Sequence, residues 1–156
     1  MADVARTANV MIRPPIAWTV AVLAGLALDW LAPLRFVPAA LPGVWVGAAI
    51  FAVAVALFAW AIATITWAGS NVPTNRPTTT IVDRGPYRFT RNPIYVGMML
   101  GLVGLAVALD TLWLLPTLAT FALVIRYGVV AREEAYLERE FGDVYRGYRR
   151  RVRRWL

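Results

Sequence analysis

The 156-residue chain is 60% hydrophobic and only 16% charged, with a net charge of +7, so it lacks the polar surface that a water-soluble domain of this length needs. It has no cysteine or histidine, which excludes disulfides, thiolate nucleophiles and the usual zinc and haem ligands. We therefore expect no bound metal, and any chemistry must use carboxylates, arginines, tyrosines, backbone groups or an organic cofactor.

The hydropathy pattern predicts an all-α integral membrane protein with about four transmembrane helices. The predicted spans cover about residues 16–34, 43–68, 93–109 and 111–130. The second is the clearest, because residues 43–69 carry no charge and, at about 1.5 Å per residue, exceed a hydrocarbon core of ~30 Å. Only Asp110 separates the last two spans, which predicts a tight helical hairpin.

The first apolar segment has a second interpretation as a signal peptide, with Arg13 as its basic flank and a cleavage site near residues 38–40. We expect a true span, since the sequence retains this segment from Met1 onwards.

The distribution of arginine predicts the orientation in the membrane. All sixteen basic residues are arginines, and only Arg35 falls between the first two spans. The others precede the first span, lie between the second and third, or follow from Arg126 onwards; the first two groups are Arg6, Arg13, Arg76, Arg84, Arg88 and Arg91. The positive-inside rule then predicts a multi-pass protein of the inner membrane, with both termini and the 70–92 loop in the cytoplasm.

Two predicted cytoplasmic segments carry most of the polar residues. The 70–92 loop contains several prolines and cannot be one helix; Asn92 and Pro93 are typical of an N-cap and a first helical position. The pattern over residues 131–156 predicts an amphipathic helix with an interruption at Gly142. Its apolar face is formed by Leu137, Phe141, Val144, Tyr148, Val152 and Trp155. This helix could also lie on the inner leaflet, with arginines near anionic headgroups.

Three glycines, Gly97, Gly101 and Gly104, lie in the third predicted span. No strand precedes them, so they do not indicate a nucleotide-binding turn. Their spacing instead predicts close packing against another helix.

Two polar, aromatic motifs lie at the ends of the predicted hairpin. The first runs from Gly85-Pro86-Tyr87 to Arg91-Asn92-Pro93-Ile94-Tyr95-Val96-Gly97; the second holds Glu133-Glu134 and then Phe141-Gly142-Asp143-Val144-Tyr145-Arg146-Gly147-Tyr148. In order and spacing they resemble the isoprenylcysteine carboxyl methyltransferase and phospholipid methyltransferase superfamily. The resemblance covers about residues 71–156. Asn92 stands where isoprenylcysteine enzymes commonly have histidine, which is more similar to the phospholipid and bacterial branches.

The resemblance implies an S-adenosylmethionine-dependent methyltransferase that acts on a lipophilic, membrane-resident substrate. We expect the C-terminal helix to fold over the first motif and to enclose a cofactor pocket. The expected cofactor-binding residues are Tyr87, Arg88, Arg91, Asn92, Tyr95, Gly97, Glu133 and Glu134. Glutamates suit a ribose diol or an ammonium group, and an arginine suits a carboxylate. Replacing Glu134 by Gln is expected to abolish cofactor binding.

Arg91 and Glu134 are the expected catalytic residues. An amine acceptor must lose a proton, for which Glu134 could be the base, whereas a carboxylate acceptor would be oriented by Arg91. The residues do not decide between these acceptors, and an ethanolamine phospholipid, an isoprenoid acid or a phenol remains open.

Other interpretations stay open. Membrane sterol reductases have a similar entry motif and bind NADPH, but they usually place an acidic residue where Met98 follows Gly97. The chain could also be a non-catalytic protein that binds membrane lipids or a partner helix. The glutamates could simply pair with Arg126 or Arg139, and the arginines of residues 149–154 are expected to serve topology and lipid contact. We expect no nucleic acid partner, and an oligomer is possible through small residues of the second span.

Overall fold

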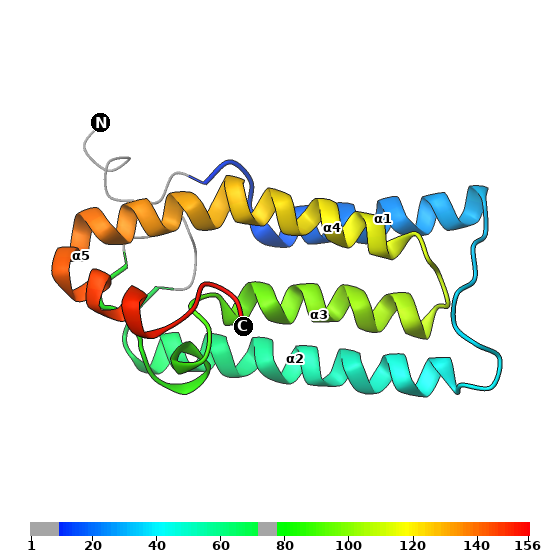
Figure 1. Cartoon of the computed structure of the whole chain (residues 1–156), viewed down its shortest axis with the longest axis horizontal. Helices are drawn as coiled ribbons and strands as arrows, with labels where there is room; N and C mark the ends of the chain where they lie inside the picture. The colour runs from blue at the N-terminus through cyan, green and yellow to red at the C-terminus, as the bar shows by residue number, and fades with distance from the viewer. Residues whose placement is uncertain (1–9, 72–77) are drawn as a thin grey trace.

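The computed structural model describes residues 10–71 and 78–156, and the regular structure in these ranges is helical. Four helices form a bundle, in which α2 packs along α3, α1 along α4, and α3 along α4 (Figure 1). Their bounds are α1 Pro14–Leu31, α2 Gly43–Trp67, α3 Pro93–Ala108 and α4 Leu114–Val124. A 3₁₀ helix, η2 (Gly85–Arg88), precedes α3, and a π-helix, η3 (Ile125–Val130), joins α4 to α5 (Ala131–Arg151).

The bundle has the character of a membrane domain. Helices α1 and α2, and the continuous helix from α4 to α5, are each long and apolar enough to cross a membrane. Helix α3 is also apolar but has only 16 residues, or about 24 Å at ~1.5 Å per residue. The predicted class, an all-α membrane protein with about four spans, is confirmed. Of the residues used in the sequence argument, Arg6, Pro73, Arg76 and Pro77 lie outside the described ranges.

The turns at the end of the bundle opposite α5 refine the predicted helix ends. Helix α1 ends at Leu31, where Ala32 leaves helical geometry, and not at residue 34. Asp110 adopts a positive φ of 48°, and helix α4 therefore starts at Leu114 and not at residue 111. The Asp110 carboxylate accepts hydrogen bonds from the amides of Phe36 and Val37 at 2.9 and 2.8 Å. This connects the α1–α2 loop to the predicted α3–α4 hairpin, which is confirmed.

Glycines allow α2 and α3 to pack closely. A Cβ at Gly104 would lie 2.7 Å from the Phe51 amide nitrogen, and one at Gly97 would lie 3.2 Å from the Ala54 carbonyl oxygen. Gly47 of α2 meets the backbone of Ala108 in the same way. The predicted packing role is thus confirmed for Gly97 and Gly104. Gly101 differs, because its nearest neighbours would be 3.7–3.9 Å from a Cβ.

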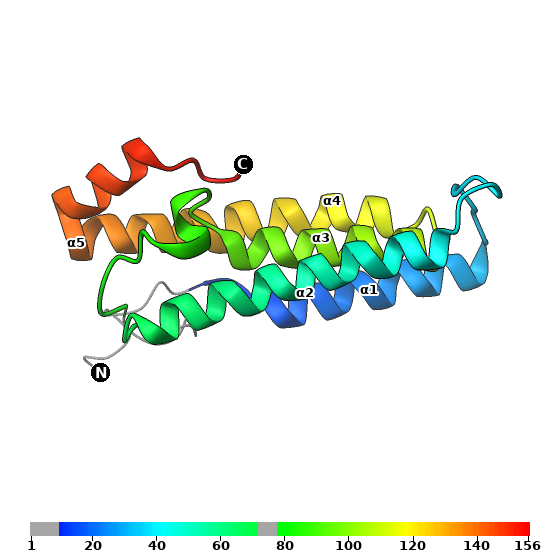
Figure 2. The same cartoon turned by 90° about the horizontal axis from the view of Figure 1, so that it is seen from below.

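The chain reverses direction within α5. Gly142 has φ 50° and ψ −120°, a conformation that other residues rarely adopt, and this turns the end of α5 back towards η2 (Figure 2). The predicted interruption at Gly142 is confirmed. The predicted helix to residue 156 is wrong at its end, because α5 stops at Arg151. The following residues extend beside Thr90, with which Arg153 forms a parallel β-bridge.

Candidate functional site

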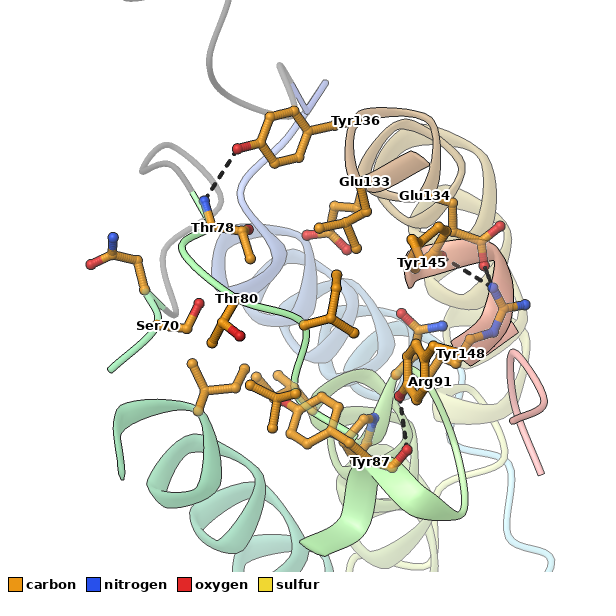
Figure 3. Close-up of a pocket in the computed structure, with 18 of the residues that line it drawn as sticks. Ser70, Thr78, Thr80, Tyr87, Arg91, Glu133, Glu134, Tyr136, Tyr145 and Tyr148 are labelled. Carbon is orange, nitrogen blue, oxygen red and sulfur yellow. Dashed lines mark hydrogen bonds and ion pairs between the residues drawn. The ribbon is translucent and has the colours of Figure 1, made fainter. Parts of the chain in front are cut away.

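A polar cavity of about 160 Å³ lies where the reversed part of α5 covers the start of α3 (Figure 3). Four segments contribute its walls: the end of the α2 region, the loop before η2, the start of α3, and α5. Its polar lining residues include Ser70, Thr78, Thr80, Tyr87, Arg91, Asn92, Tyr95, Glu133, Glu134, Tyr136, Tyr145 and Tyr148. The two motifs, one at the start of the predicted hairpin in the sequence and one after its end, therefore meet in one site.

The first motif begins with a glycine turn that packs against α2. Gly85 has φ 58°, and a Cβ there would lie 2.7 Å from Thr64 Oγ1, so the turn packs directly on α2. This placement buries Tyr87 in the wall of the cavity. The Tyr148 hydroxyl donates a hydrogen bond of 2.8 Å to the Tyr87 carbonyl and thereby connects α5 to this turn.

Asn92 occupies the predicted N-cap position of α3, but its side chain makes no capping hydrogen bond. Instead, Asn92 Nδ2 donates to the carbonyl oxygen of Arg154 at 2.9 Å. The predicted N-cap position of Asn92 and first helical position of Pro93 are confirmed, and the Asn92 side chain has a different task. The amide is used to attach the C-terminal segment because that segment returns to this point.

Glu134 lies between two arginines. Arg91 Nη1 is 2.9 Å from Glu134 Oε1, while Arg154 donates to both carboxylate oxygens, from Nε at 3.0 Å and from Nη2 at 2.6 Å. Arg91 also donates from Nη1 to the Tyr145 hydroxyl at 3.1 Å. The partners of Glu134 are thus Arg91 and Arg154, and not Arg126 or Arg139, the alternatives open from the sequence.

Glu133 has different surroundings from its neighbour. It accepts a hydrogen bond of 2.7 Å from the Tyr95 hydroxyl, and among the described residues the salt bridges of this pair of glutamates are made by Glu134. Burial, opposed by this hydrogen bond and aided by the charge of Glu134, raises the pKa of Glu133 to about 7. Glu133, at the start of α5 beyond the apolar span, can therefore change protonation near neutral pH.

Two buried polar groups of the cavity have no hydrogen-bond partner among residues 10–71 and 78–156: Arg91 Nε and the Tyr87 hydroxyl. Burial, together with the nearby Tyr148 and Glu133, raises the pKa of Tyr87, so the hydroxyl stays protonated and can donate. An unpaired buried donor is costly, by about 1–3 kcal/mol. The pair is suited to a ligand that presents an anionic or hydroxyl oxygen.

Six of the eight predicted cofactor residues line this cavity, and two do not. Arg88 is exposed, with its guanidinium 5.4 Å from the centre of the Phe89 ring. Gly97 packs against α2 and borders a different cavity. Both belong to the first motif in the sequence, but the 3₁₀ turn and the helix direct them away from the polar site.

Sequence reasoning missed several contributors, including Ser70, Thr78, Thr80 and Tyr136 of the cavity lining. Tyr145 and Tyr148 line the cavity, although they were recognised only as parts of a motif. Arg154 was grouped with the lipid-facing arginines, and for this residue that expectation is wrong because it pairs with Glu134. The tyrosines could have been found from their three-residue spacing. Arg154 had no such signal, since its position depends on the reversal at Gly142.

A second, apolar cavity of about 270 Å³ lies between α1, α2 and α3. It begins two residues further along α3 than Tyr95 of the polar cavity, at Gly97, and reaches Gly101. Its walls also include Trp18, whose Nε1 donates to the Met98 carbonyl at 2.9 Å. The two cavities therefore follow each other along one helix.

Comparison with known proteins yields one family and two relatives. A 108-residue stretch, 69% of this chain and 50% of the relative, is 29% identical to the nickel-cobalt-cadmium resistance protein NccN of Alcaligenes xylosoxydans xylosoxydans. The chain thus spans half of that relative's length. An uncharacterized protein of Haemophilus influenzae is 55% identical over 51 residues, 30% of this chain and 81% of the relative.

No solved structure matches the chain significantly. The phospholipid methyltransferase family model matches residues 42–144, about two thirds of the chain, and this range includes α2, the first motif, α3 and most of the polar cavity. The match indicates methyltransferase activity in a membrane, and the chain belongs to the phospholipid methyltransferase family.

Proposed function

We propose that this protein transfers a methyl group from S-adenosylmethionine to a lipophilic acceptor in the membrane. The observation that carries the proposal is the polar cavity, where unpartnered donors of Arg91 and Tyr87 lie in one site with Glu133. The apolar cavity along the same helix supports an acceptor with a hydrocarbon tail.

The polar lining fits the groups of the cofactor. S-adenosylmethionine supplies a methyl group already activated on a sulfonium. Arg91 Nε and the Tyr87 hydroxyl are free to donate to its amino-acid carboxylate. Glu133 is placed to accept from ribose hydroxyls or to pair with the ammonium group. Because the reversed part of α5 covers part of this lining, it limits the access of water to the cavity.

Glu133 is the better proton acceptor of the two glutamates. Both oxygens of Glu134 already accept from guanidinium groups. Among the hydrogen bonds of the described residues, Glu133 accepts one, through Oε1 from the Tyr95 hydroxyl. With a pKa of about 7, Glu133 can remove a proton from an amine or phenol acceptor at neutral pH. We therefore propose Glu133 in the role that the sequence led us to expect for Glu134, with Glu134 holding Arg91.

The membrane orientation follows from the arginines. Among the arginines of the described residues, only Arg35, in the α1–α2 loop, lies at the end of the bundle opposite α5. The positive-inside rule then puts the polar cavity and both chain ends in the cytoplasm, in a bacterial inner membrane. The cofactor would enter from the cytoplasm, and the acceptor's tail from the bilayer.

Calorimetric titration of S-adenosylhomocysteine and of NADPH into detergent-purified protein tests the proposal. We expect micromolar binding of the first alone, weakened at least tenfold in Glu133→Gln and Glu134→Gln. Glu140→Gln, which alters an exposed glutamate of the same helix, is the matched control and should bind like wild type. Binding of NADPH alone would favour a reductase, and binding of neither by folded protein would reject the proposal.

The acceptor is tested by a labelled-methyl screen of membrane lipid extracts. Gly101→Leu directs a side chain into the apolar cavity, where a Cβ has room. We expect this variant to bind S-adenosylhomocysteine normally while its KM for the lipid acceptor rises. An unchanged KM would place the acceptor's tail elsewhere.

A further inference from the structure

The C-terminal strap, Val152–Arg154, lies beside the polar cavity, bonded to residues 90–92. We infer that Arg154 of this strap is a positioning residue, which keeps Arg91 available to an anionic ligand group by sharing Glu134 with it. The inference rests on the proposed role of Arg91 in binding the cofactor carboxylate.

The strap is attached to the segment that leads into α3. The Arg91 amide donates to the Arg153 carbonyl at 2.9 Å. The Arg154 carbonyl accepts from Thr90 Oγ1 at 3.2 Å and from Asn92 Nδ2 at 2.9 Å. Three consecutive residues, 90–92, thus hold the strap beside the cavity, and this attachment brings the side chain of Arg154 onto Glu134.

The sharing of Glu134 determines which donor of Arg91 stays free. An arginine and a carboxylate prefer to meet with two parallel hydrogen bonds. Arg154 has this arrangement, with Nε and Nη2 on the two oxygens of Glu134. Arg91 therefore reaches Glu134 through Nη1 alone, and its buried Nε has no partner. Without Arg154, Glu134 is free to turn and to occupy both Nε and a terminal nitrogen of Arg91.

The charges of the cluster agree with this arrangement. Two guanidinium groups share one carboxylate, and the side chain of Arg91 is only 9% exposed. A buried positive charge in excess favours an anion as its partner. The carboxylate of the cofactor would supply that charge at Arg91 Nε.

The test compares two ligands, S-adenosylhomocysteine and its decarboxylated analogue 5′-(3-aminopropylthio)adenosine. In titration calorimetry, Arg154→Gln should lower the affinity for S-adenosylhomocysteine about tenfold and leave the affinity for the decarboxylated analogue within twofold of wild type. A general structural defect would lower the affinities for both ligands equally, and that result would overturn the inference. Wild-type protein that binds both ligands equally would also overturn it, because Arg91 would then hold no carboxylate.

Arg153→Gln is the matched control. It removes the same charge from the next residue of the strap, whose side chain is exposed, while the backbone hydrogen bond from Arg91 is retained. This variant should bind both ligands within twofold of wild type. Equal losses of affinity in Arg153→Gln and Arg154→Gln would mean that binding depends on the positive charge of the strap and not on the contact of Arg154 with Glu134.

A double-mutant cycle tests whether Arg154 acts through Glu134. Glu134→Gln with Arg154→Gln should bind S-adenosylhomocysteine within twofold of Glu134→Gln alone, because the second change then has nothing left to act on. A full additional tenfold loss would overturn the route through Glu134.

Hydrogen exchange of the ligand-free protein separates this inference from the proposed function. If wild-type protein binds no S-adenosylhomocysteine, the proposed function fails. The contact of Arg154 with Glu134 should still anchor the strap and so protect the hydrogen bond from the Arg91 amide to the Arg153 carbonyl. Hydrogen exchange at the Arg91 amide measures this protection without a ligand. Exchange that is faster in Arg154→Gln than in Arg153→Gln supports the anchoring, and equal rates overturn it.

Discussion

Glu133 and Glu134 are adjacent in the sequence but face different partners. Glu134 is held by Arg91 and Arg154, whereas Glu133 meets only the hydroxyl of Tyr95 among the hydrogen bonds of the described residues. We therefore propose a structural task for Glu134 and a ligand-binding task for Glu133. Successive residues of a helix point about 100° apart, which explains how neighbours acquire separate tasks.

The titration of Glu133 predicts pH-dependent cofactor binding. The ionised carboxylate accepts from ribose hydroxyls more strongly than the protonated form does, and only the ionised form pairs with an ammonium group; the pKa of Glu133 is about 7. Affinity for S-adenosylhomocysteine should therefore rise about tenfold between pH 6 and pH 8, as expected for one titrating group. Calorimetry across this range measures the rise, and Glu133→Gln should remove it. A profile that is equally steep in the variant would assign the titration to another group.

The same shift has the opposite sign for stability. The folded protein holds the proton of Glu133 more tightly than the unfolded chain, whose carboxyl has a pKa of 4.5. Protonation therefore contributes stability that is fully present below about pH 4.5 and is lost as pH rises through about 7. Binding and stability thus favour opposite ends of this pH window.

The sequence allowed prediction of those site residues that a motif fixes to a helix end. Arg91, Asn92 and Tyr95 lie at the proline-marked start of α3, and the glutamate pair lies just past the last apolar span. Arg154 could not be predicted, because six arginines occur within residues 146–154 and periodicity does not tell which one turns inwards. That depends on the reversal at Gly142 and the bridge to Thr90.

The seam between α2 and α3 is the tightest contact of the bundle. A Cβ at Gly104 would approach backbone atoms of Phe51 and Gly47 to 2.7–3.0 Å, which neither helix can relieve by moving a side chain. Gly104→Ala should lower the free energy of unfolding by about 1–3 kcal/mol. Denaturation in mixed micelles measures this loss. Gly101→Ala, at a site with ordinary contact distances, should change stability by less than about 0.5 kcal/mol.

The reversal of α5 depends on one glycine. Gly142 has φ 50° and ψ −120°, and alanine in such a conformation costs about 1–3 kcal/mol. Gly142→Ala should therefore loosen the fold-back, with faster hydrogen exchange at the amides of residues 143–153 and weaker binding of S-adenosylhomocysteine. Gly147→Ala is the control, because Gly147 is helical with open space at its Cβ position, and should slow exchange or leave it unchanged. Equal effects of both substitutions would contradict the special role of Gly142.

Helices were more predictable than the ways in which they end. Charge-free stretches locate α2 and α3 to within a residue, because a helix satisfies its backbone hydrogen bonds within a single apolar segment inside a membrane. The start of α4 was misplaced because the turn at Asp110 extends through residue 113, stabilised by contacts with the distant Phe36 and Val37. Such contacts join segments far apart in the sequence and leave no local pattern.

The absence of cysteine from the sequence makes the orientation of the whole molecule directly measurable. Ala40 and Glu140 are exposed at opposite ends of the bundle. In right-side-out vesicles, a membrane-impermeant maleimide should label Ala40→Cys and leave Glu140→Cys unlabelled until detergent is added. The unsubstituted protein is the blank. The reverse pattern would place the arginine-rich end outside and reject the cytoplasmic site.

The π-helix between α4 and α5 has a consequence for how the molecule tolerates change. Residues 125–130 link the membrane bundle to α5 as one uninterrupted helix. The wide turns of this linker hold about one residue more than the same stretch of ordinary α-helix. Deleting one residue of the linker would therefore convert it to α-helix and leave α5 in nearly its present orientation. A second deletion would have no wide turn left to absorb it and would rotate everything beyond it by roughly 100°, so that Glu133 and Glu134 would point away from Arg91. The linker thus tolerates the loss of one residue but not of two.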